Sequence, residues 1–528
     1  MSKFNTRAAR AVPTGPVRTT SDTARTYEGG PAYLREPRGE LLLFALTNMV
    51  GEDTFYESAT ARDQRFNDLV HTVAVEDGYW MLGFVGWLRD AAGMRSASLV
   101  AAAEAVHARL TARTLNGFNR QIIGAALKRP DEPGEMLAYW TARHGRKIPK
   151  PVKRGVADAA ARLYSERSLL KYDTDSKGFR FADVLELTHA SPADDKPWQG
   201  ELFKHAIDRR HKRDETVPER LRTIAANRAL REAAEADPEV LLDAEALRAA
   251  GMTWEDVLSL AGPRVDKAKL WTSIAPSMGI MALIRNVRNF DQARLPDDVA
   301  EAIAARICDP EAIAASRLFP YRFLSAHRAA PTQRWGHALD KALTAATANV
   351  PALPGRTLVL VDTSGSMLST VSKRSQVRHV DIGALFGVAL AHRGAEVDLV
   401  GFANGHFRQP LRKWGSALAD IDRFCARVGE VGHGTETVAA LKATYNGHDR
   451  VVLISDMQAF RWAGDSELTV SEAIPADVPM FGVNTTGYAP TVIASGTPNR
   501  YEIGGFSDKL FTLMELLVQG KDAGWPWE

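Results

Sequence analysis

The sequence predicts an α-helical repeat solenoid followed by an α/β doubly wound domain. Three observations support this prediction. Apolar residues recur at helical spacing from Gly39 to about Ala346, with only short breaks. After the hinge-like stretch 349–355, strand-like aliphatic runs alternate with helical segments. The length of 528 residues is also too great for one hydrophobic core, so the chain is multidomain.

We expect three parts along the chain. Residues 1–26 are basic and rich in Thr and Ser, without an apolar leader segment, and we predict a mobile arm. Contact of this arm with RNA is an alternative interpretation. Residues 27–348 form the predicted helical domain, and residues 349–528 form the predicted α/β domain.

The helical domain is predicted to consist of HEAT-like stacked helix pairs, because short Gly, Pro or Asp breaks separate its helices. Phe181–Leu187 and Trp254–Leu260 share an aromatic-x-Asp-Val-Leu-x-Leu pattern, which suggests internal repetition. Shared preferences of helix N-termini are an alternative explanation. The first predicted helices are Leu41–Met49, Asp63–Val75, Trp80–Ala92, Ser98–Leu110, Asn119–Leu127 and Glu135–His144.

The α/β domain is expected to open with the buried strand 357–361, whose β-branched and aliphatic residues suit the centre of a parallel sheet. Further predicted strands are 396–402, 451–455 and 479–483, and predicted helices are 378–393, 415–428, 436–445 and 507–519.

Composition indicates an ordinary globular protein in a reducing compartment. The net charge is only +2, so a nucleic-acid site must be local. Two distant cysteines, Cys308 and Cys425, argue against a disulfide framework and against a zinc site. No run of apolar residues is long enough to span a membrane, and we expect a cytoplasmic protein.

A candidate metal site follows the first strand of the α/β domain. Asp362, Ser364 and Ser366 alternate along extended chain and can converge, and their hard oxygen ligands suit Mg²⁺. Thr435, in a Gly-containing loop, and Asp456, at the end of another apolar strand, supply further ligands. This order resembles the metal-ion-dependent adhesion site of von Willebrand factor A domains. Hydroxyls that cap the next helix are an alternative interpretation.

The chemistry of this metal site favours capture of a carboxylate over catalysis. Neutral hydroxyl ligands leave positive charge on Mg²⁺ and an open position for an external Asp or Glu. The sequence has no Walker A, Gly-x-Ser-x-Gly or His-Glu-x-x-His motif. We therefore expect no enzymatic activity. A protein-interaction scaffold that uses this site is one alternative function, and a metal-dependent hydrolase is another.

Basic residues concentrate in the middle of the helical domain. Residues 141–180 hold eleven basic and four acidic side chains, a net charge of +7, and a second basic cluster spans 204–213. Such a stripe is typical of a phosphate-binding surface, although a solvated helical surface is the alternative.

Several segments of the helical domain resemble the TROVE module of the Ro autoantigen and its bacterial orthologues. The resemblance lies in Gly145–Arg154, Leu170–Tyr172, Gly178–Pro192, Ala275–Asn286 and Arg317–Leu324, with looser matches at Thr26–Gly30 and Thr54–Tyr56. The order of a helical module before an adhesion-type domain also agrees with that family.

This resemblance implies a function in RNA metabolism. It implies a monomeric ring of helical repeats whose outer surface binds small structured Y RNA and whose hole takes the ends of misfolded or unprocessed RNA. It also implies an exoribonuclease or an RNA-repair protein as partner. His189 and Lys171 match RNA-binding positions of the family, and Lys177 is a possible substitute for a missing Arg. The predicted RNA-binding residues are Lys147, Lys150, Lys153, Arg154, Arg167, Lys171, Lys177, His189, Lys204, Arg209 and Arg210.

Overall fold

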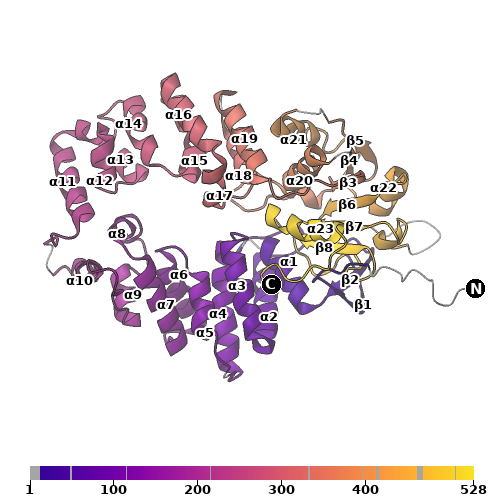
Figure 1. The fold of residues 1–528 in the computed structure, drawn as a ribbon, viewed down its shortest axis with the longest axis horizontal. Coiled ribbons are helices and arrows are strands. Elements are labelled where there is room, and N and C mark those ends of the chain that lie inside the picture. Colours follow the sequence, from indigo (N-terminus) through magenta and orange to yellow (C-terminus); the bar gives the residue numbers. More distant parts are fainter. Residues whose placement is uncertain are drawn as a thin grey trace, which may run out of the picture. The chain divides into compact units, whose positions relative to one another are not determined.

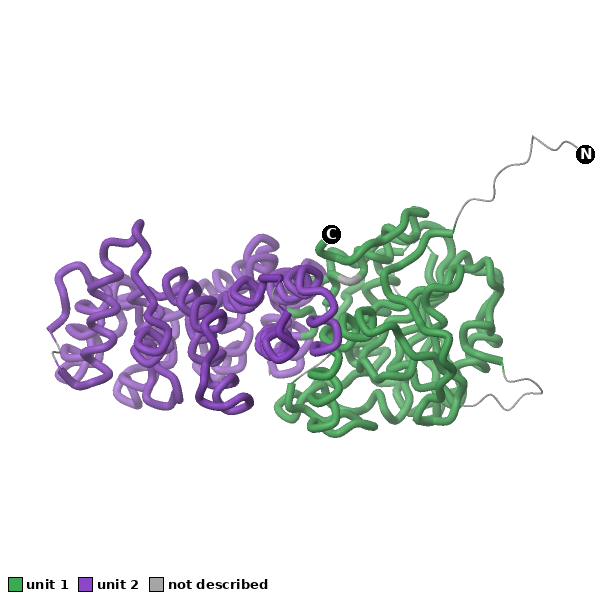
Figure 2. The backbone as a smooth tube through the Cα atoms, turned by 90° about the horizontal axis from the view of Figure 1, so that it is seen from below, with its two compact units in different colours: residues 1–69, 319–321, 346–528 green, residues 70–318, 322–345 purple. Residues whose placement is uncertain are grey.

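A computed structural model describes residues 12–47, 50–114, 116–213, 216–330, 333–394, 396–411, 415–460, 468–505 and 507–528. The chain divides into two compact units, coloured green and purple in Figure 2. Unit 1 comprises residues 1–69, 319–321 and 346–528, and unit 2 comprises residues 70–318 and 322–345.

Unit 2 is an array of helices joined by short turns (Figure 1). It starts within α2 (Ala59–Glu76), and the predicted helical repeat-like region is confirmed. Among the described residues, no helix has the length and apolar character needed to cross a lipid bilayer. The helices that follow are α3 (Gly78–Asp90), α4 (Arg95–Thr111), α5 (Asn119–Ala126), α6 (Glu132–His144), α7 (Lys150–Leu163), α8 (Glu166–Tyr172), α9 (Phe181–Thr188), α10 (Gln199–Arg210), α11 (Arg222–Ala236), α12 (Ala244–Ala249), α13 (Trp254–Ala261), α14 (Lys267–Ile274), α15 (Ile280–Gln292), α16 (Asp297–Ile307), α17 (Pro310–Ser316), α18 (Tyr321–Ala329) and α19 (Gly336–Ala346).

Side chains at helix N-termini explain where several of these helices begin. The Asp77 carboxylate accepts hydrogen bonds from two amides in the first turn of α3. The two similar segments of the sequence both open a helix, α9 and α13. Their Asp183 and Asp256 lie in the first turn, where Asp183 accepts from the amide of Arg180 and Asp256 accepts from the Thr253 hydroxyl. Helix-capping chemistry thus accounts for the shared Asp of both segments.

Unit 1 contains the predicted doubly wound α/β fold. Its sheet has the order β5-β4-β3-β6-β7-β8, and every pairing is parallel except that of β5 with β4. The strands are β3 (Arg356–Asp362), β4 (Glu396–Phe402), β5 (His406–Arg408), β6 (Arg450–Ser455), β7 (Met480–Asn484) and β8 (Arg500–Gly504). The helices of this part are α20 (His379–Arg393), α21 (Ala417–Cys425), α22 (Thr437–Thr444) and α23 (Phe511–Val518).

The central strand β3 is buried on both faces, as its aliphatic sequence predicts. Leu358 and Leu360 pack in one apolar cluster with Leu441 of α22. On the other face, Val361 contacts α20 so closely that a Cβ at Gly387 would lie 2.7 Å from its side chain. Helices on both faces of a parallel sheet define the doubly wound class.

The N-terminal segment corrects the predicted arm of residues 1–26. Residues 1–11 lie outside the described residues, but β1 (Thr19–Arg25) pairs antiparallel with β2 (Pro31–Arg35). The amide of Thr19 donates to the Ser495 carbonyl at 2.8 Å, and Arg35 forms a buried ion pair with Glu502 of β8 at 2.6 Å. Residues 12–69, including α1 (Pro37–Thr47), therefore belong with the α/β part rather than with a helical domain that begins at residue 27.

Candidate metal centre and basic surface

The loop after β3 brings one carboxylate and two hydroxyls together. Asp362, Ser364 and Ser366 are all buried, and the two hydroxyl oxygens lie 3.3 Å apart. The Ser364 amide donates to one oxygen of Asp362 at 2.8 Å, while the hydroxyl of Ser455, at the end of β6, donates to the other at 2.7 Å. The parallel pairing of β3 with β6 thus fixes the orientation of the Asp362 carboxylate.

Asp456 follows β6 at the same edge of the sheet. Its side chain is fully buried, and its Oδ1 accepts from the amide of Gln458 at 3.2 Å. The second oxygen, Oδ2, is buried without a hydrogen-bond partner among the described residues. A buried carboxylate oxygen with no donor is costly, and a cation bound at that oxygen would remove the cost.

The loop of Thr435 lies beside the Asp-x-Ser-x-Ser loop. The Gly365 amide donates to the His433 carbonyl at 2.8 Å, and Thr435 itself is buried. The Asn404 side chain accepts from the amides of His433 and Gly434 at 3.0 and 2.9 Å. A Cβ at Gly434 would lie 2.4 Å from the Asn404 side chain, so glycine at this position allows the Thr435 loop to approach the turn between β4 and β5.

The electrostatics of the site fit a divalent cation. Burial raises the pKa of both Asp362 and Asp456, and the nearby Asp362 charge raises the pKa of Asp456 further. A cation between them would offset the repulsion, and the donors are all hard oxygens, which Mg²⁺ prefers. Within the described residues, no group of three or more His, Cys, Asp or Glu is placed to hold a metal. The predicted site therefore depends on its hydroxyls.

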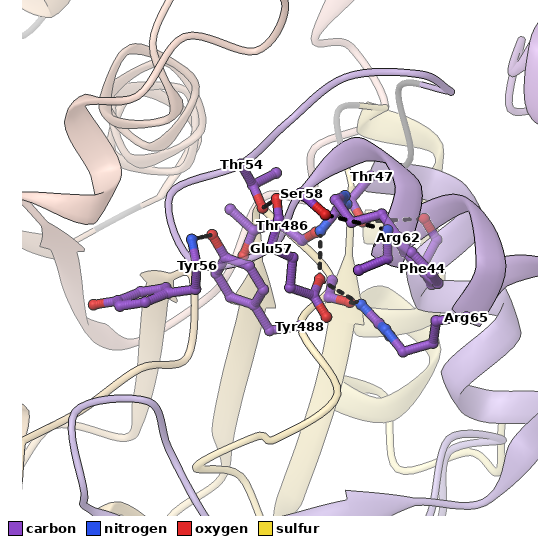
Figure 3. A network of polar contacts seen from close by, with 12 residues as sticks. Phe44, Thr47, Thr54, Tyr56, Glu57, Ser58, Arg62, Arg65, Thr486 and Tyr488 are labelled. Carbon is purple, nitrogen blue, oxygen red and sulfur yellow. Dashed lines mark hydrogen bonds and ion pairs between the residues drawn. The ribbon is translucent and has the colours of Figure 1, made fainter.

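Sequence reasoning missed two tyrosines that lie near Asp456. Tyr56 and Tyr488 pack edge to face with ring centroids 5.4 Å apart, and the Tyr56 amide donates to the Tyr488 hydroxyl (Figure 3). Asp456 contributes to the raised pKa of both phenols, after the larger effect of burial. Only the loose family match at Thr54–Tyr56 pointed to this segment, because Tyr488 comes from a loop 432 residues later.

A buried ion-pair network holds the two tyrosine segments in place (Figure 3). Arg62 bonds the Glu57 carboxylate at 2.9 Å and the Thr486 carbonyl at 2.9 Å, and its own side chain is almost fully buried. Arg65 joins the same Glu57 carboxylate at 2.9 Å and also donates to the Gly487 carbonyl. The start of α2 is thereby tied to the loop after β7.

The predicted RNA-binding residues of unit 2 fall into groups with different surroundings. Lys147, Lys150, Lys153 and Arg154 lie in the α6–α7 connection and the first turns of α7, and we call them the α7 cluster. Lys153 is half-buried and the other three are exposed. None of the four has an anionic partner among the residues that the structure describes. The first turn of α7 also contains no acidic residue, and no side chain caps it.

Arg167, Lys171, Lys177 and His189 are also exposed. Arg167 donates to the Arg248 carbonyl at 2.9 Å, and the Lys171 ammonium lies 5.2 Å from the ring centroid of Tyr172. His189 ends α9 in a left-handed conformation with φ of 54°, so its ring projects from a helix terminus. His189 ends α9, which packs against α7, whereas Arg167 and Lys171 lie on α8 and Lys177 lies in the loop between α8 and α9.

The three remaining residues, Lys204, Arg209 and Arg210, form the α10 cluster, and each is paired with an acidic residue. Lys204 bonds Asp208 at 2.5 Å, Arg209 bonds Asp173 at 3.0 Å, and Arg210 bonds Asp183 at 3.1 Å. Asp173 also bonds the buried Arg180 at 2.8 Å. Arg209 and Arg210 line a cleft of about 1110 Å³ that holds acidic as well as basic side chains.

Comparisons with known proteins agree with this fold. Residues 248–333 match the family model of the TROVE domain. The crystal structure of the Ro (RSR) protein of Deinococcus radiodurans is similar, with 18% sequence identity and a TM-score of 0.59, over 92% of this chain and 100% of that one. A search of curated proteins finds no match. The chain thus contains a TROVE-domain segment within a fold like that of a bacterial Ro protein, and its resemblance to the TROVE-module proteins is confirmed.

Proposed function

We propose that the chain is a non-catalytic RNA-binding protein that holds small structured, Y-like RNA on the surface around α7. The observation that supports this most strongly is the lack of any anionic partner for the α7 cluster among the described residues. Unpaired cations on an exposed surface are free to neutralise phosphates, and their counterions are released when RNA binds.

The position of these cations strengthens the proposal. The N-terminus of a helix carries a partial positive charge, so a Lys or Arg there costs about 0.3–1 kcal/mol of stability. Lys150 and Lys153 occupy the first turns of α7, where acidic residues are usual. A cationic helix start without a side-chain cap suits a bound phosphate, which would pair with the Lys and Arg side chains, because Pro151 leaves few free amides in this turn.

The resemblance to TROVE-module proteins extends the proposal. Ends of misfolded or unprocessed RNA would be a second ligand, and an exoribonuclease or an RNA-repair protein would act with the chain. In this proposal the protein scaffolds RNA quality control, and the chemistry on RNA belongs to the partner.

A second candidate function rests on the oxygen cluster of unit 1. We propose that Asp362, Ser364, Ser366, Thr435 and Asp456 hold Mg²⁺ or another divalent cation. The unpartnered Oδ2 of Asp456 and the buried pair of carboxylates support this assignment. The bound cation would capture the carboxylate of a partner protein, so the chain would also serve as a protein-interaction scaffold.

The test of RNA binding is the affinity of the full chain for a structured RNA, measured by filter binding. The variant Lys147→Gln/Lys150→Gln/Lys153→Gln/Arg154→Gln removes four charges, and we expect its Kd to rise by roughly a hundredfold at moderate salt. The matched control removes four exposed charges of unit 1, namely Arg374→Gln/Arg393→Gln/Lys509→Gln/Lys521→Gln. Equal affinity of both variants would contradict the proposed surface.

A further inference from the structure

Two aromatic rings of unit 2 meet at the surface where α3 and α5 begin. Tyr79 is 75% exposed, Phe118 is half-buried, and the two ring centroids lie 6.0 Å apart in an edge-to-face contact. Single apolar side chains are common on protein surfaces, whereas rings from two helices that meet there form an apolar patch. The exposed Tyr79 ring therefore presents a face that a flat apolar ligand can cover.

Arg109, near the end of α4, fixes the positions of both rings. Its side chain is buried and donates to the Gly117 carbonyl at 2.9 Å, directly before Phe118. A Cβ at Gly78 would lie 2.2 Å from Nη1 of the same guanidinium, so a side chain in the position before Tyr79 would disturb this contact. The backbones next to the two rings are thus held by one buried guanidinium.

Phe118 adopts a backbone conformation that is unfavourable for an aromatic residue. Its φ of 69° and ψ of −22° lie in the left-handed region, and no side chain caps the helix that it precedes. A bulky residue with positive φ is an outlier, and strain of this kind is concentrated at sites that bind ligands. The fold thus retains an unfavourable conformation at the residue that contacts Tyr79.

The aromatic pair lies at the same end of the neighbouring helices as the α7 cluster. Helix α5 packs against both α3 and α7 (Figure 1). A Cβ at Gly155, which directly follows the α7 cluster, would lie 2.8 Å from the Arg120 carbonyl oxygen near the start of α5. Toward the other end, Arg162 donates to the Leu127 carbonyl at 2.6 Å. The two helices therefore run in the same direction, and Phe118 lies at the end of α5 that is nearest to the α7 cluster.

An exposed aromatic face next to unpaired cations matches the chemistry of unpaired RNA. The bases of single-stranded RNA stack on aromatic side chains, whereas the bases of a duplex are already stacked on each other. The phosphates between such bases are neutralised by Lys and Arg. An apolar peptide would cover the rings but would leave the cations without a counterpart, so the combination favours RNA.

We propose that Tyr79 and Phe118 form a stacking platform for an unpaired base of the RNA whose phosphates bind the α7 cluster. This inference deepens the proposed RNA binding and rests on it. The α7 cluster can neutralise the phosphates of any nucleotide, and the platform adds a preference for RNA in which unpaired nucleotides adjoin a structured part.

The test compares two RNA probes by filter binding to the full chain, a blunt duplex and the same duplex with an unpaired extension. We expect Tyr79→Ala to raise the Kd for the extended probe by about tenfold and to leave the Kd for the blunt duplex unchanged, because only unpaired bases stack on the ring. The slope of log Kd against log salt concentration should not change, since no charge is removed. Tyr79→Trp should bind the extended probe like the unaltered chain, whereas Tyr79→Leu should bind it as weakly as Tyr79→Ala.

The matched control is Phe55→Ala, because Phe55 is an aromatic residue of unit 1 that is 57% exposed. We expect it to bind both probes like the unaltered chain. If Tyr79→Ala or Tyr79→Leu binds the extended probe normally while the fourfold Gln variant of the α7 cluster weakens binding of both probes, the stacking platform is wrong and the phosphate surface stands. If neither Tyr79→Ala nor the fourfold variant weakens binding, RNA binds elsewhere and both proposals are wrong.

Discussion

The two basic clusters of unit 2 look alike in the sequence and differ in the structure. The α7 cluster has no anionic partner among the described residues, whereas each member of the α10 cluster pairs with an acidic side chain. The acidic partners Asp173 and Asp183 come from other segments, so a count of local charge does not reveal them. A binding surface and a structural network can hold equally many basic side chains. The comparison shows that they differ in whether those side chains have acidic partners.

The largest effect on stability is expected from a change of Asp173, which tests the paired residues of this comparison. Its carboxylate binds Arg180 and Arg209 and also accepts from the Phe181 amide at 2.8 Å. Asp173→Asn removes the charge and leaves the buried Arg180 without its main partner. We expect the free energy of unfolding to fall by about 3 kcal/mol, measured by denaturant titration. A normal stability of this variant would show that the pairs of Asp173 with Arg180 and Arg209 do not stabilise the fold.

Charge reversal at the start of α7 should separate binding from stability. Lys150→Glu/Lys153→Glu places acidic residues where the helix dipole favours them, so the melting temperature should stay the same or rise slightly. RNA affinity should fall by about a hundredfold, because phosphate contacts become repulsions. A stable variant with unchanged RNA affinity would exclude the α7 cluster, and a variant with a lower melting temperature would contradict the helix argument.

Lys171 and His189 test how far the RNA surface extends beyond α7. Lys171 is exposed on α8 and His189 is exposed at the end of α9, and each can donate to a phosphate or contact a base. We expect Lys171→Ala/His189→Ala to weaken RNA binding by about tenfold, and crosslinking with sequencing in native cells to show loss of the small RNAs that the unaltered chain enriches. Retention of the same RNAs would restrict the surface to the α7 cluster.

The smallest expected effect is the stabilisation of the chain by Mg²⁺ at the proposed metal site. This site lies in unit 1, so changes there should not alter RNA binding by unit 2. Mg²⁺ at ten times its Kd should stabilise the chain by about 1.4 kcal/mol, because it binds only the folded state. Asp362→Ala should abolish this gain in a thermal melt and leave RNA affinity unchanged. Stabilisation of the variant equal to that of the unaltered chain would place the cation elsewhere.

Strong local patterns made much of the fold predictable. The aliphatic runs of β3 and β6 and the helical spacing of α2 to α6 appear where the sequence predicted them. The strands β1, β2, β5 and β8 were missed. In β8 the acidic Glu502 obscures the strand pattern, and its burial is compensated by Arg35, which is 467 residues away in sequence. A pairing over that distance leaves no signal in either segment alone.

The residues of the candidate metal site also include some that local sequence patterns predict and some that only the tertiary structure reveals. Asp362, Ser364, Ser366 and Asp456 follow apolar strands, and the structure places them together at one edge of the sheet. Tyr56 and Tyr488 come close to Asp456 from loops 432 residues apart in sequence, so neither segment alone indicates the site.

The central claim is that unpaired cations of the α7 cluster bind RNA phosphates. Its most direct test is the slope of log Kd against log salt concentration for a structured RNA, compared between the unaltered chain and the fourfold Gln variant of the α7 cluster. If each side chain neutralises one phosphate, the slope should fall by about 3. An unchanged slope would show that these cations contact no phosphate and would contradict the account.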